Sequence, residues 1–178
     1  MGTIEYRRRK NIRLNGYDYS KNGFYYITIC THNRQQILSQ ICRGGVLLRP
    51  LGQIVKSEIK NLENRYGLII EPYVIMPDHV HMIVEIPYRR EREEQSPSPT
   101  IGIADIMCAF KSITTKKCNN FENRPERQIW QRSYYDHIIR NENDHFAITE
   151  YILNNPKNHT EYTYATKNTE NFDGTEEK

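Results

Sequence analysis

Apolar and polar positions along the chain alternate in some segments and recur at helical spacing in others, which predicts both strands and helices. Residues 23–31, GFYYITICT, are rich in β-branched and aromatic side chains and predict a strand. Residues 68–76 and 79–86 are further apolar runs, joined by a short Pro-Asp connection, and predict an antiparallel hairpin. Two other segments are candidate strands, residues 45–48 and part of 127–140.

Three segments place apolar residues on one side of a helix. The first, residues 51–65, begins after a proline and ends before a glycine, as helices commonly do. The second covers about residues 101–117. The third, residues 141–155, starts with Asn and Asp and is expected to end at Pro156. The resulting order, β-(β)-α-β-β-α-β-α with antiparallel neighbours, favours an α+β fold with helices packed on an antiparallel sheet.

Two histidines interrupt the apolar pattern at the start of the run 79–86. Because side chains alternate across a strand, His79 and His81 share one face. The opposite face, toward the core, is expected to carry Val80, Met82, Val84 and Ile86. Two neutral imidazoles on one face can bind the same metal ion. Two surface histidines without a function are the alternative reading. A zinc hydrolase is another, and the candidates for its third histidine ligand are His32, His137, His145 and His159.

The segment EYILNNP, at the end of the third predicted helix, offers further chemistry. Tyr151 and Asn155 are four residues apart and therefore share a helix face. The Asn155 amide has a carbonyl oxygen that can bind a metal, and the Tyr151 phenol can attack phosphorus when a cation polarises the phosphate. By residue type alone, Tyr134 and Tyr135 are comparable candidates for the nucleophile. A packed tyrosine and an asparagine before a proline are the structural alternative.

Composition and charge are ordinary for a soluble protein. At 178 residues the chain is long enough for one domain with its own core, and no apolar run approaches the roughly 20 residues of a membrane span. The net charge is +3, and a basic run, RRRKNIR, covers residues 7–13. Such runs are either solvated arms or phosphate-binding segments. The four cysteines form no CxxC pair, which favours buried free thiols in a cytoplasmic protein.

The longer motifs around these residues resemble those of the REP-associated tyrosine transposases, a branch of the single-tyrosine HUH transposases of bacterial insertion sequences. HUH stands for histidine, a hydrophobic residue and histidine, and MPDHVHMIV fits this pattern. The similarity extends over RRKNIRLNGYDYS, YYITICTHNR, AFKSITTKK, WQRSYYDHIIRNE and EYILNNP, in the family's order. It covers nearly everything from about residue 7 to residue 156, which is far more specific than the HVH triplet alone.

The resemblance implies a ferredoxin-like palm, a central antiparallel sheet flanked by helices, with the histidine pair on a middle strand and the nucleophile on a late helix. By its position in EYILNNP, Tyr151 matches the catalytic tyrosine of the family. Asn155 matches the third metal ligand, which is a glutamine with a longer reach in other branches. Asp78 stands where asparagine is common, and no loss of chemistry is expected from it. His137 fits a recurrent position, with orientation or DNA contact as its only evident roles.

The same resemblance implies a divalent metal, Mg²⁺ or Mn²⁺, held by His79, His81 and Asn155. Tyr151 is then expected to cleave single-stranded hairpin DNA of repetitive extragenic palindromes and to form a 5′-phosphotyrosine intermediate. Rejoining needs no nucleotide cofactor, and the sequence contains neither a P-loop nor a GxGxxG motif. A monomer is favoured over a homodimer. A DNA-binding protein that has lost catalysis is the alternative from another class.

DNA contacts and domain limits complete the predictions. Phosphate contacts are expected from basic residues and stacking on unpaired bases from aromatic ones. The basic candidates are Arg7, Arg8, Arg9, Lys10, Arg13 and Lys111. The aromatic candidates are Trp130, Tyr134 and Tyr135, for which packing within the protein is the alternative. The chain divides into a basic arm at residues 1–22, the transposase domain at 23–159 and a flexible tail at 160–178.

Overall fold

The computed structural model describes residue 18 and residues 21–42, 45–88 and 101–170, with side chains up to residue 158. The strands are β1 (Gly23–Cys30), β2 (Ser39–Cys42), β3 (Gly45–Leu48), β4 (Ile69–Ile75), β5 (His79–Ile86) and β6 (Tyr135–Ile139). The helices are α1 (Pro50–Tyr66), α2 (Ile103–Glu122) and α3 (Glu142–Glu170), and a short 3₁₀ helix, η1 (His32–Arg34), follows β1.

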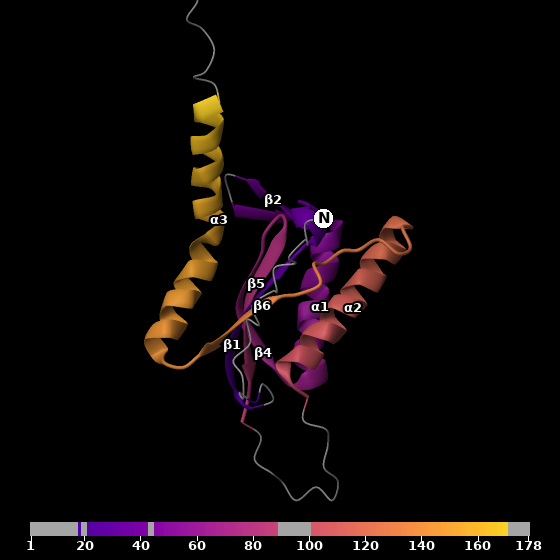
Figure 1. Ribbon diagram of the computed structural model, residues 1–178, viewed down its shortest axis with the longest axis vertical. Coiled ribbons are helices and arrows are strands. Elements are labelled where there is room, and N and C mark those ends of the chain that lie inside the picture. Colours follow the sequence, from indigo (N-terminus) through magenta and orange to yellow (C-terminus); the bar gives the residue numbers. More distant parts are fainter. Residues whose placement is uncertain (1–17, 19–20, 43–44, 89–100, 171–178) are drawn as a thin grey trace, which may run out of the picture.

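Four strands form an antiparallel sheet in the order β4-β5-β1-β6 (Figure 1). The predicted hairpin is confirmed as β4 and β5, and β5 lies in the middle of the sheet. In the register of β1 with β5, Cys30 lies opposite His79 and Thr28 lies opposite His81. β2 and β3 form a separate two-stranded hairpin.

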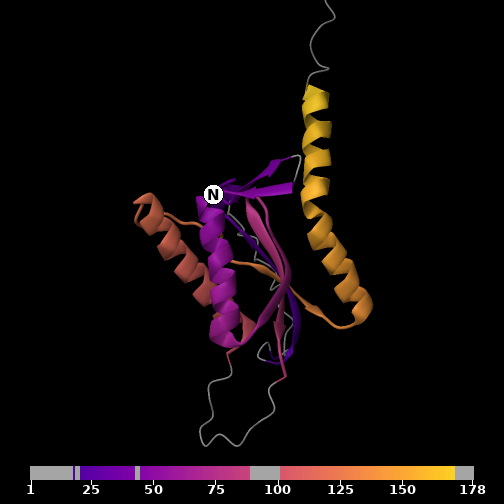
Figure 2. The ribbon, with the colours of Figure 1, turned by 180° about the vertical axis from the view of Figure 1, so that it is seen from behind.

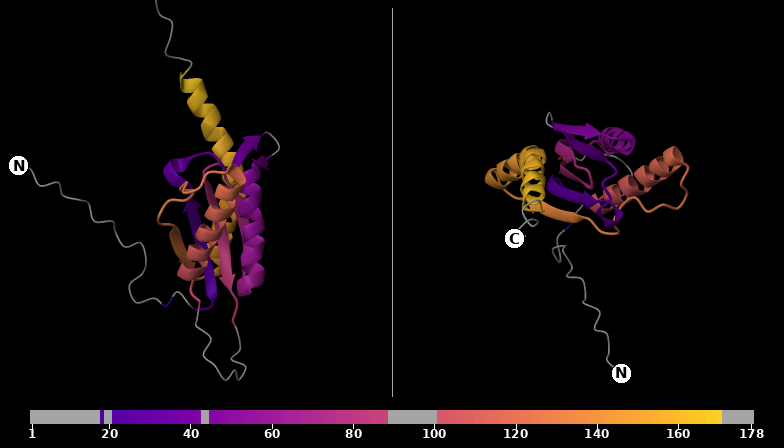
Figure 3. Two further views of the ribbon diagram at one scale, coloured as in Figure 1. Left: turned by 90° about the vertical axis from the view of Figure 1, so that its right-hand side faces the viewer. Right: turned by 90° about the horizontal axis from the view of Figure 1, so that it is seen from above.

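Helices cover both faces of the four-stranded sheet (Figures 2 and 3). α1 and α2 lie on one face, here called the α1/α2 face, and α3 lies on the other, the α3 face. Alternate strand residues fill the core beneath α1 and α2; among them are Tyr25, Ile27, Ile29, Val80, Met82 and Val84. A smaller cluster on the α3 face joins Ile83 and Ile139 to Ile152 of α3. This architecture confirms the predicted α+β fold class.

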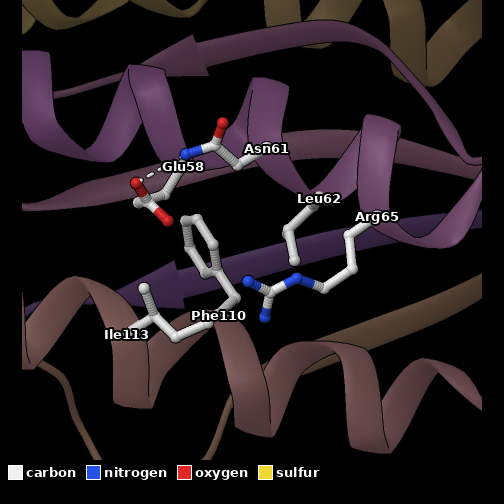
Figure 4. Close-up of a pocket in the computed structure, with 6 residues that line it drawn as sticks. All are labelled: Glu58, Asn61, Leu62, Arg65, Phe110 and Ile113. Carbon is white, nitrogen blue, oxygen red and sulfur yellow. Dashed lines mark hydrogen bonds between the residues drawn. The ribbon is translucent and has the colours of Figure 1, made fainter.

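Helices α1 and α2 pack side by side on the α1/α2 face. Phe110 reaches from α2 toward α1, between Glu58 and Leu62 (Figure 4). The Glu58 carboxylate is buried and accepts hydrogen bonds from Asn61 and from Lys117 of α2. Because a buried charge loses its hydration, these two donors compensate for a cost that would otherwise oppose folding.

The helix boundaries differ from the predictions mainly at their carboxyl ends. α2 continues to Glu122, beyond the predicted end near residue 117. α3 runs through Pro156 to Glu170, so the predicted helix end at Pro156 is wrong. Proline removes one backbone hydrogen bond, but its fixed φ is close to the helical value, so a helix can continue through it at a cost. The domain limit at residue 160 stays a prediction.

The cysteines only partly follow the sequence-based expectation. All four are free, and Cys118 is buried, but Cys42 and Cys108 are exposed. Within the described residues, none of the helices has the length and apolar character needed to cross a membrane.

Candidate active site

The two histidines of β5 lie on the α3 face of the sheet. Strand alternation turns them away from Val80 and Met82, which enter the core beneath α1 and α2. The ring centroids of His79 and His81 are 4.5 Å apart, with the ring planes at 74°. His81 is buried, with 5% of its surface exposed, and the side chain of His79 is 13% exposed. Both imidazoles therefore lie in one small site where β5 begins.

Helix α3 brings Tyr151 to the same site. The next residue, Ile152, is fully buried against Ile83 and Ile139 and anchors this part of the helix to the sheet. The ring centroid of Tyr151 lies 5.3 Å from that of His81. The Tyr151 side chain is nevertheless 48% exposed, so a substrate in solution can reach it. The structure thus gathers the predicted nucleophile and both histidines.

Two hydroxyl groups of β1 hold His81. Its Nδ1 lies 2.8 Å from the Tyr26 hydroxyl and 2.8 Å from the Thr28 hydroxyl. The sheet register explains the second contact, because Thr28 lies directly opposite His81. Burial, followed by the charges of His79 and Arg34, lowers the pKa of His81 to about 3. At neutral pH the ring is therefore uncharged, which is the form that binds metal ions.

Two tyrosines lie beside His81, and their environments differ. Burial is the main cause that raises the pKa of Tyr26 to about 12, and the Tyr26 hydroxyl is engaged with the His81 ring. The Tyr26 ring also stacks on that of His81, with centroids 5.6 Å apart. Tyr26 therefore stays protonated, with its hydroxyl hydrogen-bonded to His81, whereas Tyr151 is exposed. Of the two, Tyr151 is the one suited to attack an incoming substrate.

His79 is oriented by the residue that precedes it. The Nδ1–H of His79 donates to Asp78 Oδ1 at 2.6 Å, and the other oxygen of Asp78 accepts from Arg34 at 3.4 Å. Burial acts to raise the pKa of Asp78, but the hydrogen bond to His79 and the charges of His79 and Arg34 outweigh it and lower this pKa. The ionised carboxylate fixes the His79 tautomer in which Nε2 carries the lone pair.

Two further predicted site residues are Asn155, which follows Tyr151 closely in sequence, and Tyr135, whose ring lies near that of Tyr26. Asn155 is half-buried and follows Tyr151 by four residues on α3, so its backbone lies about one helical turn further along. Tyr135 is 46% exposed, and its ring centroid lies 6.1 Å from that of Tyr26. The metal-binding role of Asn155 and base stacking by Tyr135 stay predictions.

The other predicted DNA contacts lie elsewhere. Trp130 is 3% exposed and its indole N–H donates to Thr114, so the prediction that it stacks on bases is wrong, because the ring is enclosed in the core. Tyr134 is half-buried and packs against the same core. The Lys111 ammonium, whose pKa is lowered by burial, donates to backbone carbonyls of a neighbouring segment. Five candidates lie outside the described residues: Arg7, Arg8, Arg9, Lys10 and Arg13.

Two of the four candidates for the third histidine ligand of a zinc hydrolase contact residues outside the group of His79 and His81. His137 Nε2 lies 2.9 Å from Asp144 Oδ2, which links β6 to the first turn of α3. The His145 ring packs against Phe24 with centroids 5.2 Å apart. Across the described ranges, no three His, Cys, Asp or Glu side chains gather into a group that could hold a metal ion.

The sequence-based reasoning missed Tyr26 and Thr28. Alternation along residues 23–31 already places them on one strand face, opposite the core residues Tyr25 and Ile27. What the sequence lacks is the pairing of β1 with β5, which sets these hydroxyls against His81. The sequence could therefore show that Tyr26 and Thr28 share a strand face, but not which strand lies beside them.

An antiparallel sheet with a histidine pair on a middle strand and a tyrosine on the covering helix defines a protein of the single-tyrosine HUH type. The family model described as "Transposase IS200 like" matches residues 20–155. The chain therefore belongs to the IS200-like transposase family, which confirms the resemblance seen in the sequence motifs.

Individual relatives agree with this assignment. A protein of Haemophilus influenzae described as uncharacterized is 37% identical over 162 residues, covering 83% of this chain and 88% of the relative. The REP-associated tyrosine transposase of Escherichia coli K12 is 27% identical over 144 residues, covering 79% and 70%. A solved REP-associated tyrosine transposase, bound to a REP hairpin, superposes with a TM-score of 0.58 at 23% identity, covering 88% of this chain and 74% of that chain. This last likeness supports the fold.

Proposed function

We propose that the chain is a transposase that cleaves and rejoins single-stranded DNA through Tyr151. The observation that carries this proposal is the gathering of Tyr151, His79 and His81 at one accessible site on a transposase fold. The proposed substrate is a hairpin of repetitive extragenic palindrome DNA with single-stranded flanks. The names of a relative and of the REP-hairpin complex support this substrate class.

A divalent cation is part of the proposal, and the residues present fit one. Protein groups already contact Nδ1 of both histidines, so with the proton on Nδ1 each Nε2 offers its lone pair. Asn155 is the proposed oxygen ligand. Two imidazoles and an amide suit Mn²⁺, while Mg²⁺ has the stronger preference for oxygen. When bound, such a cation polarises the scissile phosphate and stabilises its developing charge.

Tyr151 supplies the nucleophile in this scheme. Its phenol oxygen forms a bond to phosphorus while the bond from phosphorus to the 3′ oxygen of the preceding nucleotide breaks. The phenol gives up its proton and the leaving 3′ oxygen takes one up, so the products are a 5′-phosphotyrosine and a free 3′-OH. A second DNA 3′-OH reverses the step, and the phosphodiester keeps the bond energy without a nucleotide cofactor.

One copy of the chain provides both histidines and Tyr151, so a monomer is the proposed active form. Asp78 and the two β1 hydroxyls act on the imidazoles rather than on the DNA. The basic run at residues 7–13 is retained as a proposed contact to DNA phosphates.

A denaturing gel after incubation with a labelled hairpin and Mn²⁺ tests the nucleophile. The unaltered protein should give a covalent protein–DNA band, and Tyr151→Phe should give none while binding the hairpin normally. Tyr135→Phe is the matched control, because it removes another half-exposed phenol at the edge of the site and should keep the band. A covalent band in Tyr151→Phe would assign the attack to another residue.

The same gel decides between the proposed enzyme and a DNA-binding protein without catalysis. A protein that binds the hairpin but forms no covalent band with Mn²⁺ or Mg²⁺ would be the non-catalytic alternative. Tightly bound zinc together with hydrolysis of small esters would favour the hydrolase instead.

A further inference from the structure

An open groove lies between α2 and the segment 128–132, on a part of the surface that the proposed active site does not use. We propose that this groove binds phosphates of the DNA strand that leads to the active site. The inference rests on the proposed function, because it assigns a second contact surface to the same substrate. Figure 1 shows the chain leaving the end of α2 and running back across the sheet toward β6.

The segment that forms one wall of the groove is held in place by internal hydrogen bonds. The Lys111 ammonium donates to the carbonyls of Gln131 and Arg132, the second at 2.8 Å. The side-chain amide of Gln128 donates to the carbonyl of Trp130 at 3.1 Å, and the Trp130 indole is anchored in the core. Lys111 therefore builds the groove from within rather than offering its charge to a ligand.

The remaining groove residues have the chemistry that phosphates require. Ser112, Thr115 and Lys116 follow one another at helical spacing along α2 and line one wall, and Arg132 lines the other. Hydroxyl, ammonium and guanidinium groups are the side chains that proteins use most to contact phosphate oxygens. No carboxylate is among the described residues that line the groove.

The two exposed cations of the groove differ from their neighbour Lys117. Lys117 is paired with the buried Glu58. In the described part of the chain, neither Lys116 nor Arg132 forms an ion pair, and both residues are exposed. Cations that are not used internally, set on opposite walls of one groove, are available to a polyanion.

The wall of the groove formed by the segment 128–132 is attached to the end of β1. The backbone N–H of Gln131 donates to the carbonyl of Cys30 at 2.9 Å, and Thr31 forms a bridge with Trp130. Cys30 is the residue of β1 that lies directly opposite His79. The wall that carries Arg132 is thus joined to the strand end that carries His79, so one DNA strand can contact both.

Salt-dependent binding tests this assignment. The probes are fluorescein-labelled oligothymidine, which measures phosphate contacts without sequence preference, and a palindrome hairpin from the genome that encodes the chain. The double variant Lys116→Gln with Arg132→Gln should bind oligothymidine several-fold more weakly. The slope of log K against log salt should become shallower by about 1.4, the value for two single-strand phosphate contacts.

Lys56→Gln with Arg65→Gln is the matched control, since it removes one lysine and one arginine from exposed positions of α1 that, within the described residues, form no ion pair. The control should leave the salt slope unchanged. An equal slope in the groove variant and the unaltered protein, or an equal change in the α1 control, would overturn the groove assignment. Absence of DNA binding by the unaltered protein would instead overturn the proposed function, so the two failures are distinguishable.

Discussion

The two faces of the sheet are built from the same strands but carry different kinds of side chain. Beneath α1 and α2, Tyr25, Ile27, Val80 and Met82 are fully buried in one continuous apolar core. On the α3 face, the residues that alternate with them include Tyr26, Thr28, His79 and His81, which form a polar group beside the small Ile83, Ile139 and Ile152 cluster. Each of these two strands therefore places core residues on one face and residues of the candidate active site on the other.

The difference shows how a small domain can hold polar groups in fixed positions. Burial on the α1/α2 face contributes most of the apolar area and fixes the register of β1 against β5. That register then sets Thr28 against His81 without any further packing on the α3 face. The comparison predicts that changes on the α3 face mainly alter chemistry, while changes on the α1/α2 face mainly alter stability.

The largest effect is expected from His79→Ala. Loss of one imidazole should remove the covalent band. It should also weaken Mn²⁺ binding in the absence of DNA by more than about 100-fold, which exceeds the effect of losing a residue that only contacts a metal ligand. The loss of stability should be smaller than for a core residue, because the His79 side chain, which is 13% exposed, lies outside both apolar clusters. Isothermal titration with Mn²⁺ and thermal unfolding measure the two quantities. Cleavage that persists in excess chelator would refute the metal-binding role of this face.

Met82→Ala makes the opposite change three residues further along the same strand. Met82 is fully buried on the α1/α2 face, so truncation should lower the free energy of unfolding by about 2–5 kcal/mol. Met82→Leu conserves the volume and should cost less than about 1.5 kcal/mol. Both variants should form the covalent band at temperatures where they remain folded. A stable Met82→Ala protein without activity would mean that the two faces are not separable in this way.

The adjacent tyrosines of β1 give the sharpest matched pair. Tyr26→Phe removes one of the two hydroxyls at His81 Nδ1 and should weaken Mn²⁺ binding by about 10-fold. Tyr25→Phe removes a hydroxyl that donates to the Lys21 carbonyl on the other face and should cost about 1 kcal/mol of stability with metal affinity intact. Titration calorimetry and denaturant unfolding on both variants check the pair, and equal metal affinities would remove the assigned role of Tyr26.

The sequence was sufficient for features that depend on local periodicity. Alternation along residues 79–86 placed His79 and His81 together and Val80 and Met82 in the core, as the structure confirms. The motif EYILNNP placed Tyr151 on a late helix, and α3 brings its ring to His81. These predictions needed only the two-residue period of a strand and the family's motif order.

Features that depend on tertiary contacts were not available from the sequence. An aromatic residue in a polar segment is equally consistent with stacking on DNA and with packing, and only the fold shows that Trp130 is enclosed beside Thr114. A lysine on a predicted helix is equally consistent with a phosphate contact and with an internal hydrogen bond, and only the fold shows that Lys111 donates to backbone carbonyls. The hydroxyl partners of His81 come from a strand more than fifty positions away in the chain.

Asp78→Asn is expected to have the smallest effect and therefore tests how much of the α3 face is electrostatic. An asparagine oxygen can still accept the hydrogen bond from His79 Nδ1, so the ring keeps its orientation and tautomer. The change removes a negative charge that would strengthen His79 in its proposed role as a metal ligand, so Mn²⁺ affinity should fall by less than about 10-fold. Asp78→Ala removes the acceptor as well and should weaken Mn²⁺ binding further. Equal affinities of the two variants would show that the charge of Asp78, and not its hydrogen bond, is what His79 needs.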